Sequence, residues 1–418
     1  MHTDAGPFLQ RIRAFPDDDA PRLIFADWLD DRGGRGADRA AFIRVQIALA
    51  GVPDDDRRRP ALLAAERDLL DAHRDDWEAP FRGLATGLEF RRGFVDEVKV
   101  TARQFARHAP ELFAAGPIRH AHLLDVGGSL AAVVQSPFLG RLSALTVYAQ
   151  HAGGGLARTL ARGPHLAGLR ALNLVRNRLG DDAAGHVAGA RVFAGLEELD
   201  LSENALGETA ARALAASPHL GRLRRLELRL NPLGPAGAEA LAGSDRLAAL
   251  HHLGLADTGL GAARLLGLPR ASALLRVPSL DLSGNGLTPA GLRAILTRPA
   301  DDPDPVRLEA LNLSHNDLGE AGARVLAESP ALAGLKVLRL VGCRITDEAA
   351  HALAHARPLN HLPALDLGNN PVYDRGFRAF LETPYLRGLR RLAIPGLGVS
   401  APMRHALNQR FHRGLVRF

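Results

Sequence analysis

One frame of apolar and polar positions recurs along most of the chain. Aliphatic residues stand at its first, fourth and sixth positions and asparagine at its ninth, as in LEELDLSEN from Leu196. The centre of the frame alternates with the period of a short strand, with Leu199 and Leu201 on one face and polar neighbours on the other. Apolar residues at helical spacing follow, so each copy predicts one strand, one turn and one helix.

The frame occurs eleven times at a nearly constant spacing. From Leu142 to Val277 successive copies are 27 residues apart, the next step is 31 residues, and the last three steps are 27 again. Parallel strands pack closer together than helices do, so a stack of such units must curve. We therefore predict a right-handed α/β solenoid, or horseshoe, with a parallel concave sheet and convex helices. The copies start at Ile118, Leu142, Leu169, Leu196, Leu223, Leu250, Val277, Leu308, Leu335, Leu362 and Leu389.

The ninth position predicts an internal ladder of polar side chains. A chain that leaves a strand inside the solenoid exposes backbone donors and acceptors, and an asparagine amide can satisfy both kinds. Thr258 and Cys343 replace asparagine in two copies, and each can donate one hydrogen bond. We predict a structural role for Cys343; a catalytic thiolate is the alternative. The asparagines are Asn177, Asn204, Asn231, Asn285, Asn316 and Asn370.

The first 80 residues lie outside the repeat and predict a small all-α module. Helices are expected over 8–15, after a cap at Asp19 or Ala20 with Pro21 at the first helical position, over 40–49 and over 61–73. From Leu88 the segment EFRRGFVDEVKV alternates like a strand pair, which would cap the first repeat. The pattern thus predicts the module at 1–80, a cap at 81–117, about eleven repeats at 118–400, and a basic C-terminal tail at 401–418.

Two segments resemble known families. The frames over about residues 95–400 resemble the leucine-rich repeat of the ribonuclease-inhibitor type. That resemblance implies the horseshoe and a habit of binding proteins on the concave sheet or the rim loops. FLQRIRAFPDDDAPRLIFADWLDDRG, followed by AFIRVQIAL, resembles the repeat-companion domain found ahead of repeats in planctomycete-type bacterial proteins, and it implies no mechanism.

Composition and charge narrow the class of protein. Apolar residues make up 46% of the chain and aromatic residues only 5%, which favours a core of many small, similar layers. The net charge is +6, but nearly all basic residues are arginines interleaved with acids, so nucleic acid is an unlikely partner. A lone cysteine excludes an intramolecular disulfide. With no long apolar run, we expect a cytoplasmic protein without a membrane segment.

Several histidines stand close together in the sequence, as metal ligands can. His351 and His355 stand four apart on one helix face, but no third ligand is evident in the sequence. His120 with His122, and His251 with His252, are interpreted as strand residues that face water or a partner. We therefore predict no metal ion.

Other candidates for chemistry are two acidic runs. Residues 17–19 and 54–56 are three aspartates each, but they lack the glycine and the spacing of a calcium loop, so helix capping and solvation explain them. No phosphate-binding or hydrolase motif occurs. We predict no catalytic residue and no cofactor.

The outward strand positions are the predicted binding surface. The hypothesis is a non-catalytic scaffold that binds a protein through the concave sheet or the rim loops, one of which would be the insertion at 297–307. A regulator of a GTPase, of the activating type, and weak arginine-mediated nucleic-acid binding are the alternatives. The predicted partner-binding residues are Glu198, Asp200, Arg225, Glu227, Arg229, Asp281, Arg339 and Asp366.

Overall fold

The chain divides into two compact units. A computed structural model describes residues 5–53, 56–261, 271–297 and 306–411. Unit 1 comprises Met1–Gln150 and Arg162–Asn173, and unit 2 comprises His151–Ala161 and Leu174–Phe418. The predicted rim insertion at 297–307 falls largely outside the described residues. None of the helices in the described ranges combines the length and the apolar character that a membrane span requires.

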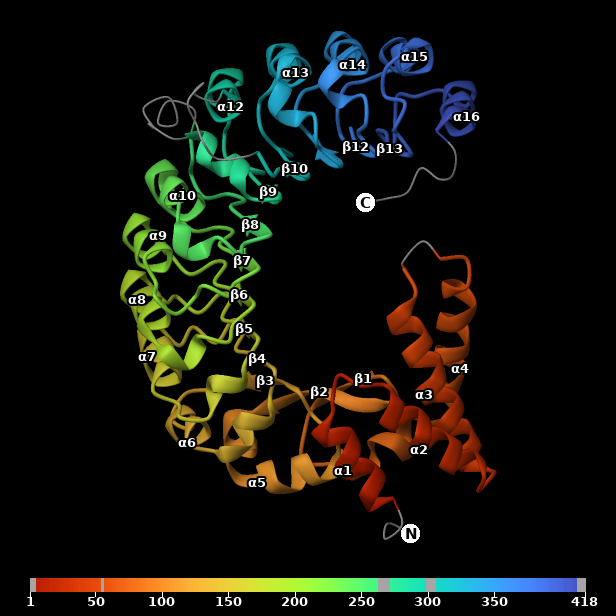
Figure 1. Ribbon diagram of the computed structural model, residues 1–418, viewed down its shortest axis with the longest axis vertical. Coiled ribbons are helices and arrows are strands. Elements are labelled where there is room, and N and C mark those ends of the chain that lie inside the picture. Colours follow the sequence, from red (N-terminus) through yellow and green to blue (C-terminus); the bar gives the residue numbers. More distant parts are fainter. Residues whose placement is uncertain (1–4, 54–55, 262–270, 298–305, 412–418) are drawn as a thin grey trace. The chain divides into compact units, whose positions relative to one another are not determined.

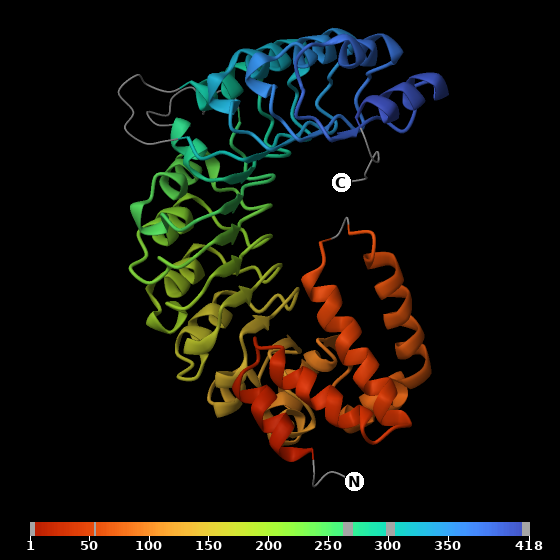
Figure 2. The same cartoon turned by 45° about the vertical axis from the view of Figure 1, so that its right-hand side comes forward.

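The N-terminal stretch of unit 1 is all-helical, as predicted. Asp19 precedes the second helix without capping it; instead, Asp18 Oδ1 accepts a hydrogen bond from the Ala20 N–H at 2.9 Å. The third and fourth helices run side by side as a long pair (Figure 2). The helices are α1 (Gly6–Ala14), α2 (Ala20–Asp30), α3 (Arg35–Gly51) and α4 (Arg59–Glu78).

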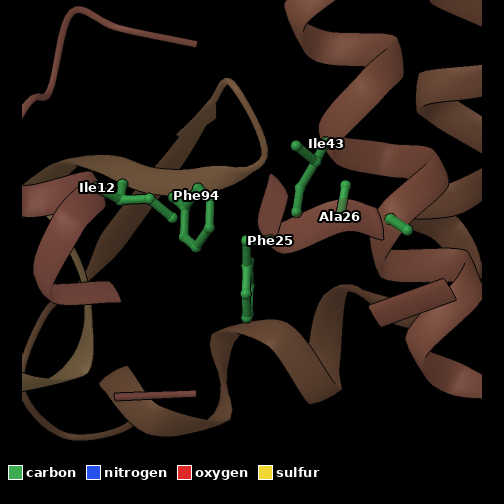
Figure 3. Close-up of a cluster of buried hydrophobic side chains, with 6 residues drawn as sticks. Ile12, Phe25, Ala26, Ile43 and Phe94 are labelled. Atoms are coloured by element: carbon green, nitrogen blue, oxygen red, sulfur yellow. The ribbon is translucent and has the colours of Figure 1, made fainter. Parts of the chain in front are cut away.

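A hairpin docks on these helices and shares their core. Strands β1 (Gly87–Arg91) and β2 (Phe94–Thr101) pair antiparallel, which confirms the predicted strand pair. Phe94 packs with Phe25 and Ile43 from α2 and α3 (Figure 3). Gly93, in the turn, has φ +86° and lies so close to α3 that a Cβ there would be 2.3 Å from Ile43 Cγ1. Gln46 accepts the Gly93 N–H at 2.6 Å, so the hairpin is fixed on α3.

The hairpin begins the parallel sheet of unit 1. Strands β3 (His120–Leu124), β4 (Ala144–Thr146) and β5 (Ala171–Asn173) follow β2 in chain order, each parallel to the strand before it. Helices α5 (Ala102–Ala115) and α6 (Leu130–Val134) connect the first of these strands. Thr101 begins α5 with a reciprocal cap, in which its hydroxyl accepts the Gln104 N–H.

Unit 2 repeats the strand, turn and helix pattern. Its strands lie on the inner side of the curve and its helices on the outer side (Figure 1). Each of the eleven predicted frames forms a strand, from β3 to β13, so the predicted α/β repeat solenoid is confirmed. The strands are β6 (Glu198–Asp200), β7 (Arg225–Glu227), β8 (His252–Gly254), β9 (Ser279–Asp281), β10 (Ala310–Asn312), β11 (Val337–Arg339), β12 (Ala364–Asp366) and β13 (Arg391–Ala393). The helices are α7 (Gly154–Ala161), α8 (Asp181–Gly189), α9 (Glu208–Ala215), α10 (Gly234–Ala242), α12 (Pro289–Leu296), α13 (Gly319–Glu328), α14 (Asp347–Ala354), α15 (Asp374–Glu382) and α16 (Ala401–Arg410).

The predicted asparagine ladder is present in unit 2. Asn204 Oδ1 accepts the Asn177 N–H at 2.8 Å, and its Nδ2 donates to the carbonyls of Leu174 and Leu201, both at 2.9 Å. Cys343 occupies one ladder position and donates from Sγ to the Leu313 carbonyl at 3.1 Å. Burial raises the pKa of this thiol to about 11. The interpretation of Cys343 as a structural residue is therefore confirmed.

Candidate functional site

The solvent-facing side chains of the strands, here called the strand face, carry the residues predicted to bind a partner. The register places Glu198 beside Arg225 on neighbouring strands and Asp200 beside Glu227. Glu198, Arg225, Arg229 and Arg339 are exposed. The strand face of unit 2 is thus a mixed-charge surface on a backbone that hydrogen bonds hold in place.

Three of the predicted binding residues accept a hydrogen bond from the backbone of the turn that follows their strand. Asp200, Asp281 and Asp366 each accept, through Oδ1, the backbone N–H of the residue two positions later, all at 2.9 Å. Asp366 is buried, and burial raises the pKa of Asp200 above its ordinary value. Such a local bond stabilises the exit from each strand. These carboxylates therefore have a structural role in addition to the predicted one.

Glu227 is the centre of a polar cluster on the strand face. It forms an ion pair with Arg225, and its Oε1 lies 2.9 Å from His252 Nε2. The Nδ1 of His252 is 2.9 Å from the Ser279 hydroxyl. Gly254 leaves room for Glu227, because a Cβ there would overlap the carboxylate. His252, predicted to be a strand residue that faces water or a partner, lies on the strand face as a half-buried member of this cluster.

The row of carboxylate, imidazole and hydroxyl in this cluster has the order used by nucleophilic hydrolases. Such enzymes also need N–H donors that point at a developing oxyanion. The N–H of Ser279 instead donates to the His251 carbonyl at 2.8 Å, within the sheet. The arrangement therefore lacks the donor that the nucleophile itself would supply, and it carries no catalytic assignment.

Unit 1 has a cluster that sequence reasoning missed. Glu97 on β2 reaches both histidines of β3: its Oε2 lies 3.0 Å from His120 Nδ1, and its Oε1 lies 2.7 Å from His122 Nε2. The two imidazole rings are 4.4 Å apart. The signal in the sequence was the HAH of residues 120–122, whose two histidines share one face of a strand. That Glu97 faces them follows only from the pairing of β2 with β3.

Burial sets the electrostatics of this cluster. The side chains of His120 and His122 are 20% and 24% exposed and that of Glu97 is 11% exposed. Burial lowers the pKa of His120, against the attraction of Glu97. The two histidines are strand residues, as predicted, but they are half-buried in a group with a carboxylate and do not stand alone in water.

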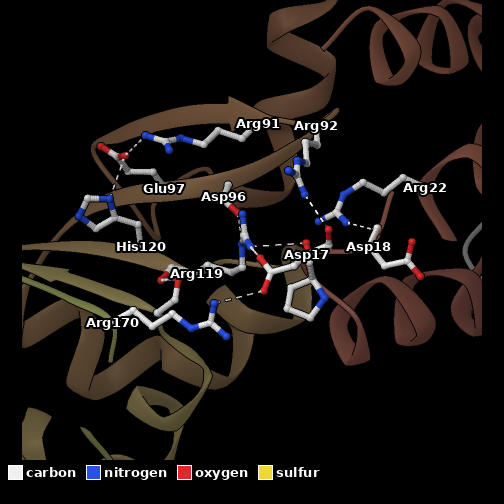
Figure 4. Close-up of polar contacts among 12 residues, drawn as sticks. Asp17, Asp18, Arg22, Arg91, Arg92, Asp96, Glu97, Arg119, His120 and Arg170 are labelled. Carbon is white, nitrogen blue, oxygen red and sulfur yellow. Dashed lines mark hydrogen bonds and ion pairs between the residues drawn. The ribbon is translucent and has the colours of Figure 1, made fainter. Parts of the chain in front are cut away.

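The acidic run at residues 17–19 binds arginines of unit 1. Asp17 Oδ1 lies 2.7 Å from Arg119 Nη1 and its Oδ2 lies 3.7 Å from Arg170 Nη1, while Asp19 lies 3.5 Å from Arg92 Nε (Figure 4). Helix capping and solvation do not account for these contacts. Besides the bond from the Ala20 N–H to Asp18 at the start of α2, the run thus fixes the loop between α1 and α2 to the first strands.

The paired histidines on the helical side lack a third ligand among the described residues. His351 on α14 and His355 at the C-cap of this helix stack with ring centroids 4.3 Å apart, and His355 Nδ1 is 2.9 Å from the His351 carbonyl. The cluster of Glu97, His120 and His122 is the group of three metal-ligating side chains that the described part of the chain brings together.

Comparison with known proteins agrees with the repeat. The family model described as Leucine Rich repeat matches residues 196–215, 223–242, 279–296, 308–327 and 335–354. The chain therefore carries leucine-rich repeats, and its fold is a leucine-rich-repeat solenoid. A search of curated proteins gave no significant match.

Three solved structures show distant similarity. A structure of the Rad7 and Elc1 complex in yeast has 15% identity and a TM-score of 0.48, with 96% of this chain and 95% of that chain covered. An internalin from Listeria monocytogenes has 14% identity and a TM-score of 0.45, with 77% and 95% covered. The plant peptide hormone receptor RGFR1 in complex with RGF2 has 15% identity and a TM-score of 0.33, with 61% and 40% covered. At this level of similarity none of them indicates what the present chain binds.

Proposed function

We propose that the protein is a non-catalytic scaffold that binds a protein partner through the strand face of unit 2. The observation that supports this most is the adjacent pair Glu198 and Arg225, exposed on neighbouring strands β6 and β7. The strands fix the backbone that carries these side chains, so no backbone segment has to become ordered when a partner binds them. Arg229, with its side chain 55% exposed, extends the same surface toward the rim.

The contacts within unit 2 narrow the predicted patch. Asp200, Asp281 and Asp366 accept backbone N–H groups, and Glu227 is shared between Arg225 and His252. Substituting these residues would perturb the fold together with any interface. Glu198 and Arg229 are the better positions at which to test binding, because both are exposed and the ion pair of Arg229 with Asp257, 3.7 Å from Nε to Oδ2, is an exposed one.

The distribution of ion pairs bears on the nucleic-acid alternative. Many arginines of unit 2 lie next to acids, for example Arg176 and Glu203 at 3.1 Å, and Arg344 and Asp317 at 3.0 Å. Neutralised arginines release few counterions from a phosphate backbone. The structure thus favours a protein partner of mixed charge over a nucleic acid.

Charge reversal at the strand face tests the proposal. We expect E198R/R229E to reduce recovery of a partner by ~10-fold or more in quantitative affinity capture from the native cell, because interface charges that are reversed repel their partners. The matched control is E208R/R212E, which makes the same exchange on the exposed face of α9. Equal recovery with both variants would contradict the proposed surface.

A further inference from the structure

We propose that Glu97, His120 and His122 form a binding site for a divalent transition metal ion of the zinc class. This site is independent of the proposed partner surface, since it lies in unit 1. Two imidazoles and one carboxylate are the ligand set of many zinc sites that keep a coordination position open. One ligand atom from each of the three residues lies within 4.8 Å of the other two.

The spacing of the donor atoms fits such an ion. Glu97 already lies 3.0 Å from His120 Nδ1 and 2.7 Å from His122 Nε2. Ligand bonds of about 2.0–2.2 Å place two ligands of a tetrahedral ion about 3.3–3.6 Å apart. The side chains would therefore have to separate by less than ~1 Å at each of these contacts. Rotations about side-chain torsions supply such a shift without moving the strands.

A hydrogen bond at the second ring nitrogen orients one of the three ligands, His120. His120 Nε2 lies 2.9 Å from the hydroxyl of Thr146, a buried residue of β4. If Nε2 donates to this hydroxyl, Nδ1 is unprotonated and its lone pair points to the site. Metal-binding histidines are commonly held by such a hydrogen bond at the second ring nitrogen.

His122 supplies a second indication of a ligand. Its Nε2 is buried and has no hydrogen-bond partner among the described residues, because the short contact with Glu97 is not aligned as a hydrogen bond. A buried nitrogen without a partner carries a free-energy cost. A metal ion between Nε2 and the carboxylate would remove that cost.

Two cations lie near the site and bear on its affinity. Arg91 Nη2 is 3.4 Å from Glu97 Oε2, and its side chain is 62% exposed. Lys99 follows Glu97 on the same face of β2, but its chain lies against Gly87 of β1, where a Cβ would be 3.0 Å from Lys99 Cδ. Arg91 is thus the competitor for the carboxylate, and it is exposed enough to move into water.

The chain contains its own controls. Glu227 and His252 repeat the contact of carboxylate and imidazole, but Gly254 stands where a second histidine would be needed. His351 and His355 offer two imidazoles, and the described residues add no carboxylate to them. Neither pair should hold an ion as firmly as three ligands do.

Zinc titration of the tag-free, full-length protein tests the site. Competition with a chromogenic chelator should give one tightly bound Zn²⁺ per chain. We expect E97Q, H120Q and H122Q each to weaken binding by roughly 100-fold or more, and T146V by roughly 10-fold, since loss of an orienting partner costs less than loss of a ligand. R91A should strengthen binding, because it removes the competing cation. H252Q and H351Q/H355Q should leave the affinity unchanged.

A second measurement guards against loss of folding. Zn²⁺ should raise the melting temperature of the wild type, followed by fluorescence of the two tryptophans, Trp28 and Trp77, both in unit 1. H122Q should melt within a few degrees of the wild-type temperature without zinc, since it removes a single half-buried contact with Glu97, and should show no rise with zinc. Absence of a tightly bound ion, or its retention in H120Q and H122Q, would overturn the proposal.

Discussion

The ladder asparagines from Asn204 onward each serve two repeats at once. Asn204 satisfies carbonyls of its own turn and of the preceding repeat, and it accepts the N–H of Asn177. Its neighbours Glu203 and Ala205 both have φ +57°, a left-handed conformation that costs about 1–2 kcal/mol per non-glycine residue. The hydrogen bonds of the asparagine therefore hold a turn that its own backbone disfavours.

We expect N204A to lower the free energy of unfolding of unit 2 by about 2–4 kcal/mol, because several buried backbone groups lose their partner. Urea unfolding followed by far-ultraviolet circular dichroism measures this change. The control is E208A, an exposed change on α9 of the same repeat, which should stay within about 0.5 kcal/mol. A similar cost for both variants would show that the ladder does not stabilise the turn.

Cys343 is a ladder residue whose side chain can ionise. Its pKa is about 11 in the folded protein, above its ordinary value of 9.0, because the thiol is buried. The raised pKa therefore contributes fully to the free energy of unfolding below pH 9, and this contribution is lost as the pH rises toward 11. Between pH 8 and pH 10, wild type should lose about 1 kcal/mol more stability than C343S, whose hydroxyl does not titrate in this range.

Denaturant unfolding of both proteins across this pH range checks the thiol prediction. As a control at pH 8, a thiol reagent should label Cys343 only after unfolding, since the residue is fully buried. Parallel pH profiles for wild type and C343S would be incompatible with a raised pKa.

At the scale of elements, arginines fix the loop between α1 and α2 to the sheet. Arg119 donates to Asp96 at 2.6 Å and to Asp17 at 2.7 Å. Burial alone would lower its pKa, but the hydrogen bond and the charge of Asp96 outweigh burial and raise it. Asp96 is 8% exposed at its side chain, whereas Asp17 is 65% exposed. The bond to the buried Asp96 therefore contributes more to the free energy of unfolding than the bond to the exposed Asp17.

We expect R119M to destabilise unit 1 by about 3–5 kcal/mol, because it leaves the buried carboxylate of Asp96 unpaired. D17N should cost less than about 1 kcal/mol, as is typical of exposed pairs. Tryptophan fluorescence during urea unfolding measures both. R35M, which breaks the exposed pair with Asp76, is the matched control and should have almost no effect. A cost for R119M no larger than that of R35M would refute a structural role for this bond.

At the scale of the whole molecule, the α module and the first strands belong to one compact unit. The pattern of residues placed a boundary near residue 80, where the predicted cap of the repeats begins. The side chains cross that boundary, since Phe25 packs with Phe94 and Asp17 pairs with Arg119. The predicted domain boundaries mark where the residue pattern changes and stay predictions. The two compact units are defined by which residues contact each other.

The sequence determined the features that depend on near neighbours in the chain. Alternation fixed the eleven strands, and the ninth position predicted the ladder and the place of Cys343, because every repeat provides the same local environment. The helices of the first 80 residues followed from periodicity and proline, with ends shifted by a few residues.

Only the tertiary structure decided which polar groups meet. Glu97 faces His120 and His122 because β2 pairs with β3 in one register, and a shift of one residue would turn the carboxylate to the other face of the sheet. Likewise, Asp200 and Glu198 look equivalent in sequence. In the fold, Asp200 is half-buried and accepts the N–H of Ser202 in the following turn, whereas Glu198 is exposed. Register and burial are properties of the packed chain, so the candidate metal ligands and the narrower binding surface emerged only from the fold.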